Sequence, residues 1–334
     1  MSAGDNGASI LRATIPQYRA FVVTAPMEGR LPVLTMNSVA HEKFRPYVGR
    51  MIAGLEHLRR SVAACAIALA ASAGTTLAGE DASAWDGDAR GAIRLIAGSW
   101  AAGSSAMRAG IEIKLKPGWH TYWRYPGDAG VPPRFDFAGS VNVKAVNVLW
   151  PAPRRLPEEG LSVIGYVDNV ILPLVVVPQS RKQPVLLRLK AEYALCEKLC
   201  LPAQASAELA LGQGSSSWDP ALAAAQLRVP KRHSLGDAGE LAIRSVRRET
   251  DISRPRVLID VAAPAGANVE VFVEGPSPEW TLPLPVAAGT AAGALHRFAF
   301  DLDGAPPGAK YEGTVITVTA VAGNEAIEVL AALD

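Results

Sequence analysis

Short segments that alternate apolar and polar residues, separated by glycine, proline or aspartate, constrain the fold of this chain most strongly. In Gly110-Ile111-Glu112-Ile113-Lys114-Leu115 the apolar side chains recur every second residue, which is the period of a β-strand. Turn sequences follow at Lys116-Pro117-Gly118 and at Pro126-Gly127-Asp128. The 30 glycines and 25 prolines suit many short strands joined by turns and argue against an all-α bundle.

The strand-like segments fall into two sets, so the sequence predicts an all-β chain of two tandem β-sandwich domains. The first domain, 90–212, has strands expected at 92–97, 107–115, 120–125, 141–149, 170–177, 184–193 and 205–211. The second domain, 235–334, has strands expected at 241–246, 256–261, 269–274, 295–300, 313–320 and 327–330. The linker between them, 213–234, begins with glycine and serine and is expected to hold a short helix, with Asp219 as its cap and Pro220 in its first turn.

An export signal is predicted well inside the chain. Arg59 and Arg60 precede the apolar run 61–71, which is too short to span a bilayer comfortably and is followed by small-x-small sites. We therefore expect a signal peptide over 51–78, translation that starts at Met51, a mature protein that starts near Gly79, and a segment 1–50 that is not native. The mature protein is expected to be exported, without a membrane span.

Charge and motifs exclude several functions. The 33 basic and 32 acidic residues give a formal charge of +1, and no long run of lysine or arginine indicates a nucleic-acid surface. The chain lacks a GxSxG elbow, a Walker loop, a Rossmann glycine fingerprint and an HExxH segment. The sequence therefore offers few candidates for chemistry other than its cysteines, and no cofactor is expected.

The mature chain would retain one cysteine pair, Cys196 and Cys200, because Cys65 lies in the predicted signal. In an extended strand, residues four positions apart lie about 13 Å apart, whereas the Cα atoms of a disulfide lie about 4.4 to 6.8 Å apart. The residues Glu197-Lys198-Leu199 must therefore turn if the two cysteines pair.

Three uses of the pair remain open from the residues alone. As a structural bond it would close a loop of about five residues, worth only roughly 2 kcal/mol in the chain-entropy model, so we favour thiol exchange. Metal binding is the weakest reading, because two thiolates need further ligands and no zinc-type spacing is present. Copper(I) bound with a nearby methionine or histidine stays a minor alternative.

Two motifs resemble a known family. The stretch Lys116–Gly130 reads KPGWHTYWRYPGDAG, and further along stands Tyr193-x-x-Cys196-x-x-x-Cys200-x-Pro202. Together they resemble the N-terminal periplasmic domain of DsbD-type thiol:disulfide interchange proteins, and the ScsB-like branch is the nearer match. The resemblance covers roughly 90–212 and implies an immunoglobulin-like sandwich, whereas 235–334 carries no such motif.

The resemblance also implies roles for individual residues. Cys200 would be the cysteine attacked in the mixed disulfide, and Cys196 would resolve it. A cap loop that shields the pair would correspond to Pro157-Glu158-Glu159-Gly160-Leu161, where Glu158 and Glu159 are either modulators of proton movement or solvated loop charges. Four further residues are expected to line or support the site, although each is also a reasonable core or surface residue: Tyr122, Tyr166, Tyr193 and His120.

The resemblance implies an electron relay between proteins. The partners would be a membrane-embedded thiol reductant, as electron donor, and thioredoxin-like periplasmic proteins, as acceptors. DsbD members separate their cysteines by more residues and carry a membrane channel and a thioredoxin domain, so this chain is expected to depend on a separate donor. The alternative is a non-catalytic periplasmic binding or adaptor protein with a structural disulfide, linked to copper handling.

Overall fold

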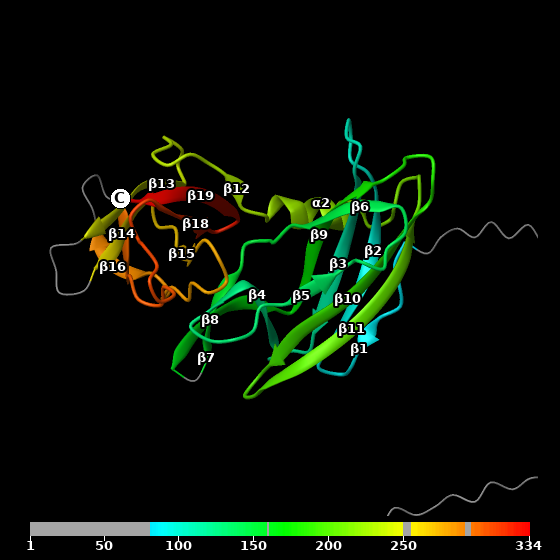
Figure 1. Ribbon diagram of the computed structural model, residues 1–334, viewed down its shortest axis with the longest axis horizontal. Coiled ribbons are helices and arrows are strands. Elements are labelled where there is room, and N and C mark those ends of the chain that lie inside the picture. The colour runs from blue at the N-terminus through cyan, green and yellow to red at the C-terminus, as the bar shows by residue number, and fades with distance from the viewer. Residues whose placement is uncertain (1–80, 159, 250–254, 291–294) are drawn as a thin grey trace, which may run out of the picture. The chain divides into compact units, whose positions relative to one another are not determined.

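The computed structural model describes residues 81–334 except 159, 250–254 and 291–294 (Figure 1). These residues fold into β-sheets with one α-helix described, so the predicted all-β class is confirmed. The segment Thr76–Asp334 forms one compact unit. The expected division into two tandem domains therefore stays a prediction, and we describe the strands as an N-terminal and a C-terminal pair of sheets. The predicted signal at 51–78 and the segment 1–50 lie outside the described residues.

The N-terminal pair of sheets contains the cysteines. The first sheet has the order β1 (Asp86–Gly87), β2 (Gly91–Trp100), β3 (Met107–Leu115), β9 (Asn169–Pro178), β6 (Val143–Val148). The second has the order β11 (Cys200–Leu211), β10 (Val185–Cys196), β4 (His120–Gly127), β8 (Leu161–Val167), β7 (Arg154–Glu158), with β5 (Arg134–Asp136) also paired to β10. Neighbouring strands in both sheets are antiparallel, as in a β-sandwich.

The hydrophobic core between these two sheets follows from the period-two pattern. Ile111, Ile113 and Leu115 of β3 are buried, and so is Leu187 of β10 in the other sheet. Each such side chain contributes about 1.5 to 3 kcal/mol when it leaves water. Glu112 points away from this core and accepts a hydrogen bond from Arg94 at 2.7 Å. The alternation in the sequence therefore assigned the faces of this strand correctly.

The predicted short helix is present as α2 (Asp219–Leu227), with Pro220 in its first turn. The sequence predicted that Asp219 caps this helix. In the structure the N-cap position belongs to Trp218, so that prediction is wrong. The Asp219 carboxylate instead accepts hydrogen bonds from the Ser99 amide, at 2.9 Å, and from Arg108, at 2.7 Å, which join the helix to β2 and β3. Within the described residues, no helix has the length and apolar character needed to cross a bilayer.

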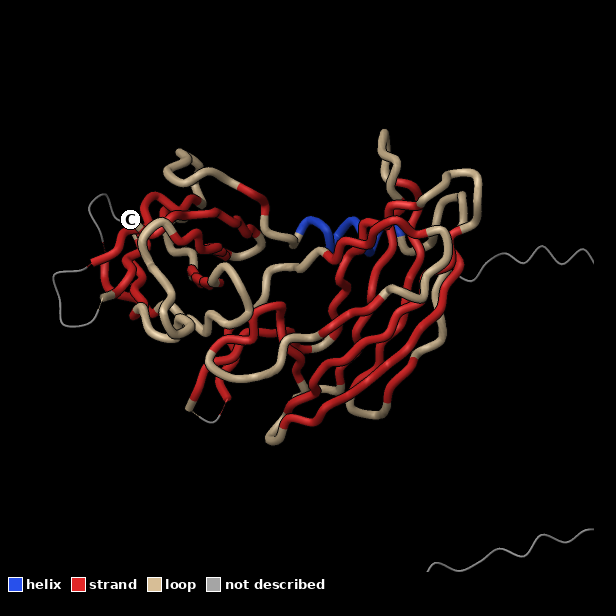
Figure 2. The backbone as a smooth tube through the Cα atoms, in the orientation of Figure 1, coloured by secondary structure: helices blue, strands red, loops and turns tan. Residues whose placement is uncertain are grey.

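The C-terminal pair of sheets has a separate core. One sheet has the order β12 (Lys231–Arg232), β19 (Glu325–Leu333), β18 (Thr314–Ala322), β15 (Val269–Glu274). The other has the order β13 (Ala242–Glu249), β14 (Arg256–Ala262), β17 (His296–Asp301), β16 (Val286–Thr290). Buried residues of both sheets, such as Ile259 and Val318, form one hydrophobic cluster. Figure 2 shows long loops between several of these strands.

Strand β4 connects the two pairs of sheets. Phe272 of β15 is fully buried in the N-terminal core, where its ring lies 6.0 Å from that of Trp123. Arg124 bonds to Glu274 at 2.6 Å and to Glu328 at 2.5 Å, and both carboxylates belong to C-terminal strands. These shared contacts explain why the whole segment forms one compact unit.

Candidate functional site

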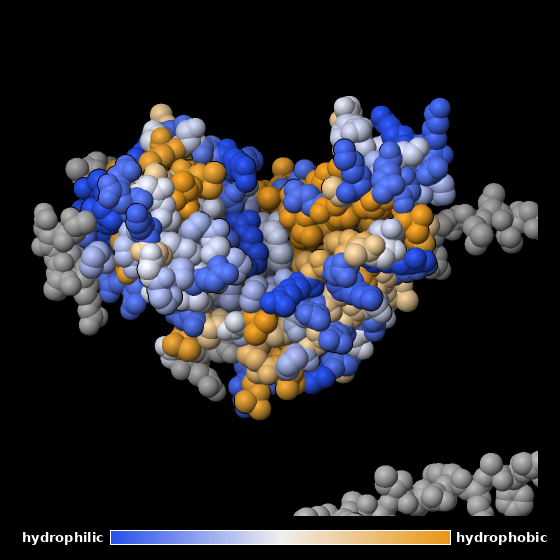
Figure 3. Space-filling view, viewed as in Figure 1, coloured by the Kyte–Doolittle hydropathy of each residue, from blue (hydrophilic) through white to orange (hydrophobic). Residues whose placement is uncertain are grey.

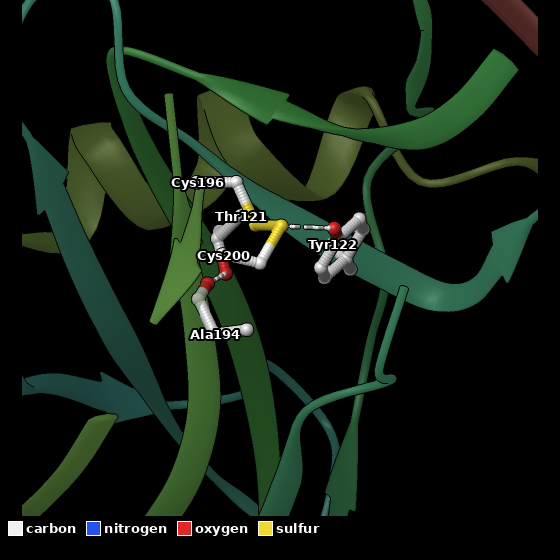
Figure 4. Close-up of a disulfide and its surroundings, with 5 residues drawn as sticks. All are labelled: Thr121, Tyr122, Ala194, Cys196 and Cys200. Carbon is white, nitrogen blue, oxygen red and sulfur yellow. Dashed lines mark hydrogen bonds between the residues drawn. A yellow bond between two sulfur atoms is a disulfide. The ribbon is translucent and has the colours of Figure 1, made fainter. Parts of the chain in front are cut away.

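The two cysteines form a disulfide at the end of a β-hairpin (Figure 4). Cys196 is the last residue of β10, Cys200 is the first of β11, and they face each other directly in the register with Cα atoms 4.1 Å apart. The Glu197 amide donates a hydrogen bond to the Leu199 carbonyl at 3.4 Å. The prediction that residues 197–199 turn is therefore confirmed.

The two sulfur-bearing residues differ in exposure. Cys196 is fully buried, at 0% exposure, whereas Cys200 is exposed and follows Leu199, which is 75% exposed. A thiolate breaks a disulfide by attacking one sulfur while the other leaves. Of the two cysteines, Cys200 is the one with a solvent-facing surface that an incoming thiol can reach.

Tyr122 contacts both sulfur atoms. Its side chain is 1% exposed, and its Oη lies 2.9 Å from Cys200 Sγ and 3.1 Å from Cys196 Sγ (Figure 4). Sulfurs joined in a disulfide carry no hydrogen, so the phenol O–H is the donor. A hydrogen bond to a charged group is stronger than one to a neutral group. The hydroxyl is therefore placed to stabilise the thiolate that forms when the bond breaks.

A small apolar cluster surrounds the buried cysteine, separate from the main core. Cys196, Tyr122, Val163 and Ala194 are its buried members, and Leu156 of β7 packs against it with Ala129. Burial without a polar partner penalises a charged thiolate. In this cluster, the Tyr122 hydroxyl is a polar group that contacts Cys196 Sγ.

Near the disulfide, a hydrogen bond from the Thr121 side chain supplements the sparse backbone pairing between β4 and β10. Strand β4 pairs with β10 only at His120 and Cys196. Two residues earlier on β10, the carbonyl of Ala194 accepts a buried hydrogen bond from the Thr121 hydroxyl at 2.8 Å. A buried carbonyl without a partner would be unfavourable, so Thr121 replaces a missing backbone bond. Sequence reasoning missed Thr121, because a threonine in a strand carries no distinctive pattern.

Glycine permits the close approach of β8 to β4. A Cβ added at Gly165 would lie 2.2 Å from the carbonyl oxygen of Thr121, so no larger residue fits there without moving the strand. Gly165 pairs with Tyr122 in the register. This position therefore helps to set the location of Tyr122 at the disulfide.

The structure does not bring Tyr166 or Tyr193 to the disulfide. Both lie in the main core, because side chains alternate between the faces of a strand and Cys196 lies on the opposite face of β10 from Tyr193. The hydroxyl of Tyr166 donates to the carbonyl of Pro151 at 2.7 Å, and burial raises the pKa of Tyr166 well above its usual value. Burial also raises the pKa of Tyr193 to about 12.

His120 lies beside the site and contacts Tyr122. It is 8% exposed, it pairs with Cys196 in the register, and its ring packs edge-on against that of Tyr122 with centroids 5.7 Å apart. The ring therefore buttresses the tyrosine that contacts the sulfurs.

The segment 157–161, expected as a cap loop, lies where β7 and β8 meet in a β-hairpin. Pro157 pairs with Ser162, and Glu158 pairs with Leu161, so β7 continues almost to the turn. A proline is tolerated there because β7 is the last strand of its sheet. The side chain of Glu158 and all of Glu159 lie outside the described residues. From this hairpin, Leu156 reaches the cysteine cluster.

Metal binding by the cysteine pair was the weakest of the three alternatives that the sequence left open. In the described part of the chain, no group of three or more histidine, cysteine, aspartate or glutamate side chains is arranged to hold a metal ion.

Comparison with known proteins identifies the N-terminal part. Residues 95–211 match the model of the family described as "Thiol:disulfide interchange protein DsbD, N-terminal". These residues form a DsbD-type N-terminal domain. The resemblance stated from the two sequence motifs is thereby confirmed, and the matched range includes Tyr122, Cys196 and Cys200.

A solved structure extends the likeness beyond the DsbD-type domain. The N-terminal periplasmic domain of ScsB from Proteus mirabilis matches with a TM-score of 0.58 and 18% identity, over 76% of this chain and 98% of that chain. At this identity the match shows the fold. It covers far more of the chain than 95–211, so the shared fold includes C-terminal strands. No curated protein matches the sequence.

Proposed function

We propose that this chain is an exported thiol–disulfide exchange protein that relays electrons through Cys196 and Cys200. The observation that carries the proposal is the asymmetric disulfide, with Cys200 exposed, Cys196 buried and the Tyr122 hydroxyl within reach of both sulfurs. The DsbD-type domain supports the reaction class. The solved ScsB domain is periplasmic, which supports the same compartment for this chain.

The relay proceeds in balanced steps. In the reduced protein, the Cys200 thiolate attacks a disulfide of a thioredoxin-like acceptor, forming a mixed disulfide and releasing one acceptor thiolate. The Cys196 thiolate then attacks Cys200 Sγ, forming the intramolecular bond and releasing the second acceptor thiolate. The two released sulfurs take up the protons given up by Cys196 and Cys200. Two electrons thus pass to the acceptor, and a membrane-embedded thiol donor restores the dithiol by the reverse sequence.

The surrounding residues have distinct tasks in this proposal. The Tyr122 hydroxyl donates to whichever sulfur carries negative charge, and His120 and Gly165 keep the ring in place. Glu158 and Glu159 keep the role that the resemblance implies for them, the modulation of proton movement at the cysteines. Tyr166 and Tyr193 stabilise the core.

The organisation of the rest of the chain belongs to the same proposal. A signal peptide over 51–78, cleaved near Gly79, would deliver the protein to the periplasm. The described unit would then comprise a redox sandwich, 90–212, a linker with α2, 213–234, and a second sandwich, 235–334.

The reduction potential of the Cys196–Cys200 bond tests the function. The full chain is equilibrated in glutathione buffers, and alkylation is read by peptide mass so that Cys65 does not contribute. A relay is expected to lie in the range of exchange proteins, about −180 to −270 mV. A value below about −300 mV would mark a structural bond and favour the adaptor alternative.

A further inference from the structure

A cleft adjoins the disulfide site, with one wall from each pair of sheets. Its volume is about 630 Å³. One wall is the end of β4 and the loop after it, 124–130 with Pro132, and the other is the segment after β15, 274–278, with Thr281 and Pro283. The function proposed above assigns no task to this second wall.

One tyrosine ring separates this cleft from the sulfur atoms. A Cβ added at Gly130 would lie 2.4 Å from Cε1 of Tyr122, and Gly130 has a φ of +109°, so glycine allows the wall of the cleft to lie directly against the ring. The hydroxyl of the same ring lies 2.9 Å from Cys200 Sγ. Ala129, also in the wall, packs against the cysteine cluster. A molecule joined to Cys200 therefore lies close to the cleft.

The charged groups of the cleft are few and are bonded within the protein, although Asp128 keeps an exposed carboxylate. Arg124 is 25% exposed at its side chain and is bound by Glu274 and Glu328. Asp128 accepts a hydrogen bond from the Ser162 amide at 3.2 Å. Apart from these charged groups and Tyr125, the walls consist of glycine, proline, alanine, serine and threonine. Because so few lining residues are charged, such a surface suits an uncharged segment better than a highly charged one.

The walls are also stiff. Prolines occur at five positions of the lining: Pro126, Pro132, Pro276, Pro278 and Pro283. Proline fixes φ and reduces the freedom that a loop loses when it binds a partner. The hydroxyl of Tyr125 donates to the carbonyl of Leu282 at 2.7 Å and joins the two walls. The cleft is therefore formed before any partner arrives.

We propose that the cleft receives an uncharged loop next to the reactive cysteine of the protein partner, so that both pairs of sheets form the docking surface. This inference rests on the proposed function. The partner's sulfur reacts at Cys200, and its neighbouring residues enter between the loop 126–132 and the segment 275–283. A small thiol reacts at the same sulfur without using the cleft. Docking in the cleft thus selects protein thiols.

The test compares a protein thiol with a small thiol. Reduced thioredoxin and glutathione are each mixed with the oxidised full chain, and reduction of the Cys196–Cys200 bond is followed by alkylation and peptide mass. Ser277→Trp fills the cleft from the C-terminal wall. Ser277→Ala removes only the hydroxyl, and Ser234→Trp places the same ring on an exposed loop outside the cleft. Circular dichroism checks that each variant is folded.

We expect Ser277→Trp to slow reduction by thioredoxin at least about tenfold, as for a residue in the centre of an interface, and to leave reduction by glutathione within about twofold. Both control variants should match the parent chain. Equal rates for Ser277→Trp and the parent with thioredoxin would overturn the docking role, as would equal slowing with both thiols. If the parent itself reacts no faster with thioredoxin than with glutathione, the proposed relay fails instead.

Discussion

The two pairs of sheets share one architecture but differ in how regularly their strands pair. In the C-terminal pair, β18 and β19 pair without interruption from Thr314 to Ala322. In the N-terminal pair, β10 is paired with β5 near its middle and with β4 only at Cys196, and the Thr121 hydroxyl serves the carbonyl of Ala194 between them. The disulfide therefore lies where β10 is fully paired with β11 but has little backbone pairing on its other side, and the Thr121 side chain supplies one of the bonds there.

The surfaces differ as well. In the view of Figure 3, hydrophobic residues cover a broader area over the N-terminal sheets than over the C-terminal sheets. Next to the exposed cysteine, Leu199 adds to this area, since it is 75% exposed. Contiguous exposed apolar surface is typical of sites that bind other proteins.

The largest expected effect is the different outcome of replacing each of the two cysteines. Cys200→Ala should abolish electron transfer, because it removes the sulfur that partners reach, whereas Cys196→Ala should accumulate a mixed disulfide with a thioredoxin-like partner through Cys200. Non-reducing electrophoresis and peptide mass distinguish the two. In the chain-entropy model, losing the bond lowers the free energy of unfolding by only about 2 kcal/mol. A mixed disulfide trapped on Cys196 would contradict the assignment.

Phe272→Ala tests whether the two pairs of sheets unfold together. Phe272 belongs to a C-terminal strand but is buried in the N-terminal core, so its removal should lower the free energy of unfolding by about 3 to 5 kcal/mol in a single transition. Calorimetry measures the transition. As a control, Phe300→Ala removes a ring of the C-terminal core. Two separate unfolding transitions, of which Phe272→Ala shifts only one, would support independent tandem domains instead.

Tyr122→Phe tests what the hydroxyl next to the two sulfurs contributes to the reaction. It keeps the ring against Gly130 but removes the hydrogen bond to the leaving thiolate, so reduction by glutathione should slow by roughly ten- to a hundredfold. The rate is measured by stopping samples of the reaction at intervals with an alkylating agent and determining the fraction of reduced protein. Tyr193→Phe is the matched control, because its buried hydroxyl has no hydrogen-bond partner among the described residues. Equal rates for both variants would remove Tyr122 from the chemistry.

The smallest effect concerns acid stability in the C-terminal sheets. Hydrogen bonds from Arg297 lower the pKa of Asp260, and Ser245 and Arg247 act in the same direction. Because the pKa of Asp260 is lower in the folded state, its charge stabilises the fold at pH values above its pKa in the unfolded chain, about 3.9. This stabilisation is lost as the pH falls through the pKa of the folded state. Denaturation at several pH values should show a smaller acid loss for Asp260→Asn. An unchanged pH dependence would exclude Asp260 as a contributor.

Sequence predicted the strands well where alternation was clear. The limits of β3 and β15 agree with the expected 107–115 and 269–274. The strands β7 and β8 were missed, because Pro157 and the Glu-Glu-Gly sequence read as a loop and the pairing of an edge hairpin carries no local signal. The contact of Trp123 with Phe272, which links the two pairs of sheets, could not be predicted either. Periodicity shows that a side chain is buried but not which core it enters.

The site was predicted in part for a similar reason. The turn between the cysteines followed from geometry, and the structure brings Tyr122 and His120 beside them. Tyr193 lies three residues before Cys196 on β10, so alternation alone puts the two side chains on opposite faces. Tyr166 lies on β8, and its face relative to Cys196 depends on how the strands pair. Nothing in the sequence indicated that Thr121 and Leu156 support the cysteines, because their roles depend on which strands meet there.

The position of the disulfide at the end of β10 and β11 has a consequence for the relay cycle. Every residue of β10 from Val185 to Cys196 pairs with a partner on β11, so the hairpin stays closed whether its terminal sulfurs are joined or separate. We therefore expect the oxidised and reduced forms to share nearly the same backbone. In the proposed relay, a partner would then distinguish the two forms only by direct contact with the sulfurs, and the rate of transfer would depend on the frequency of encounters and the difference in reduction potential.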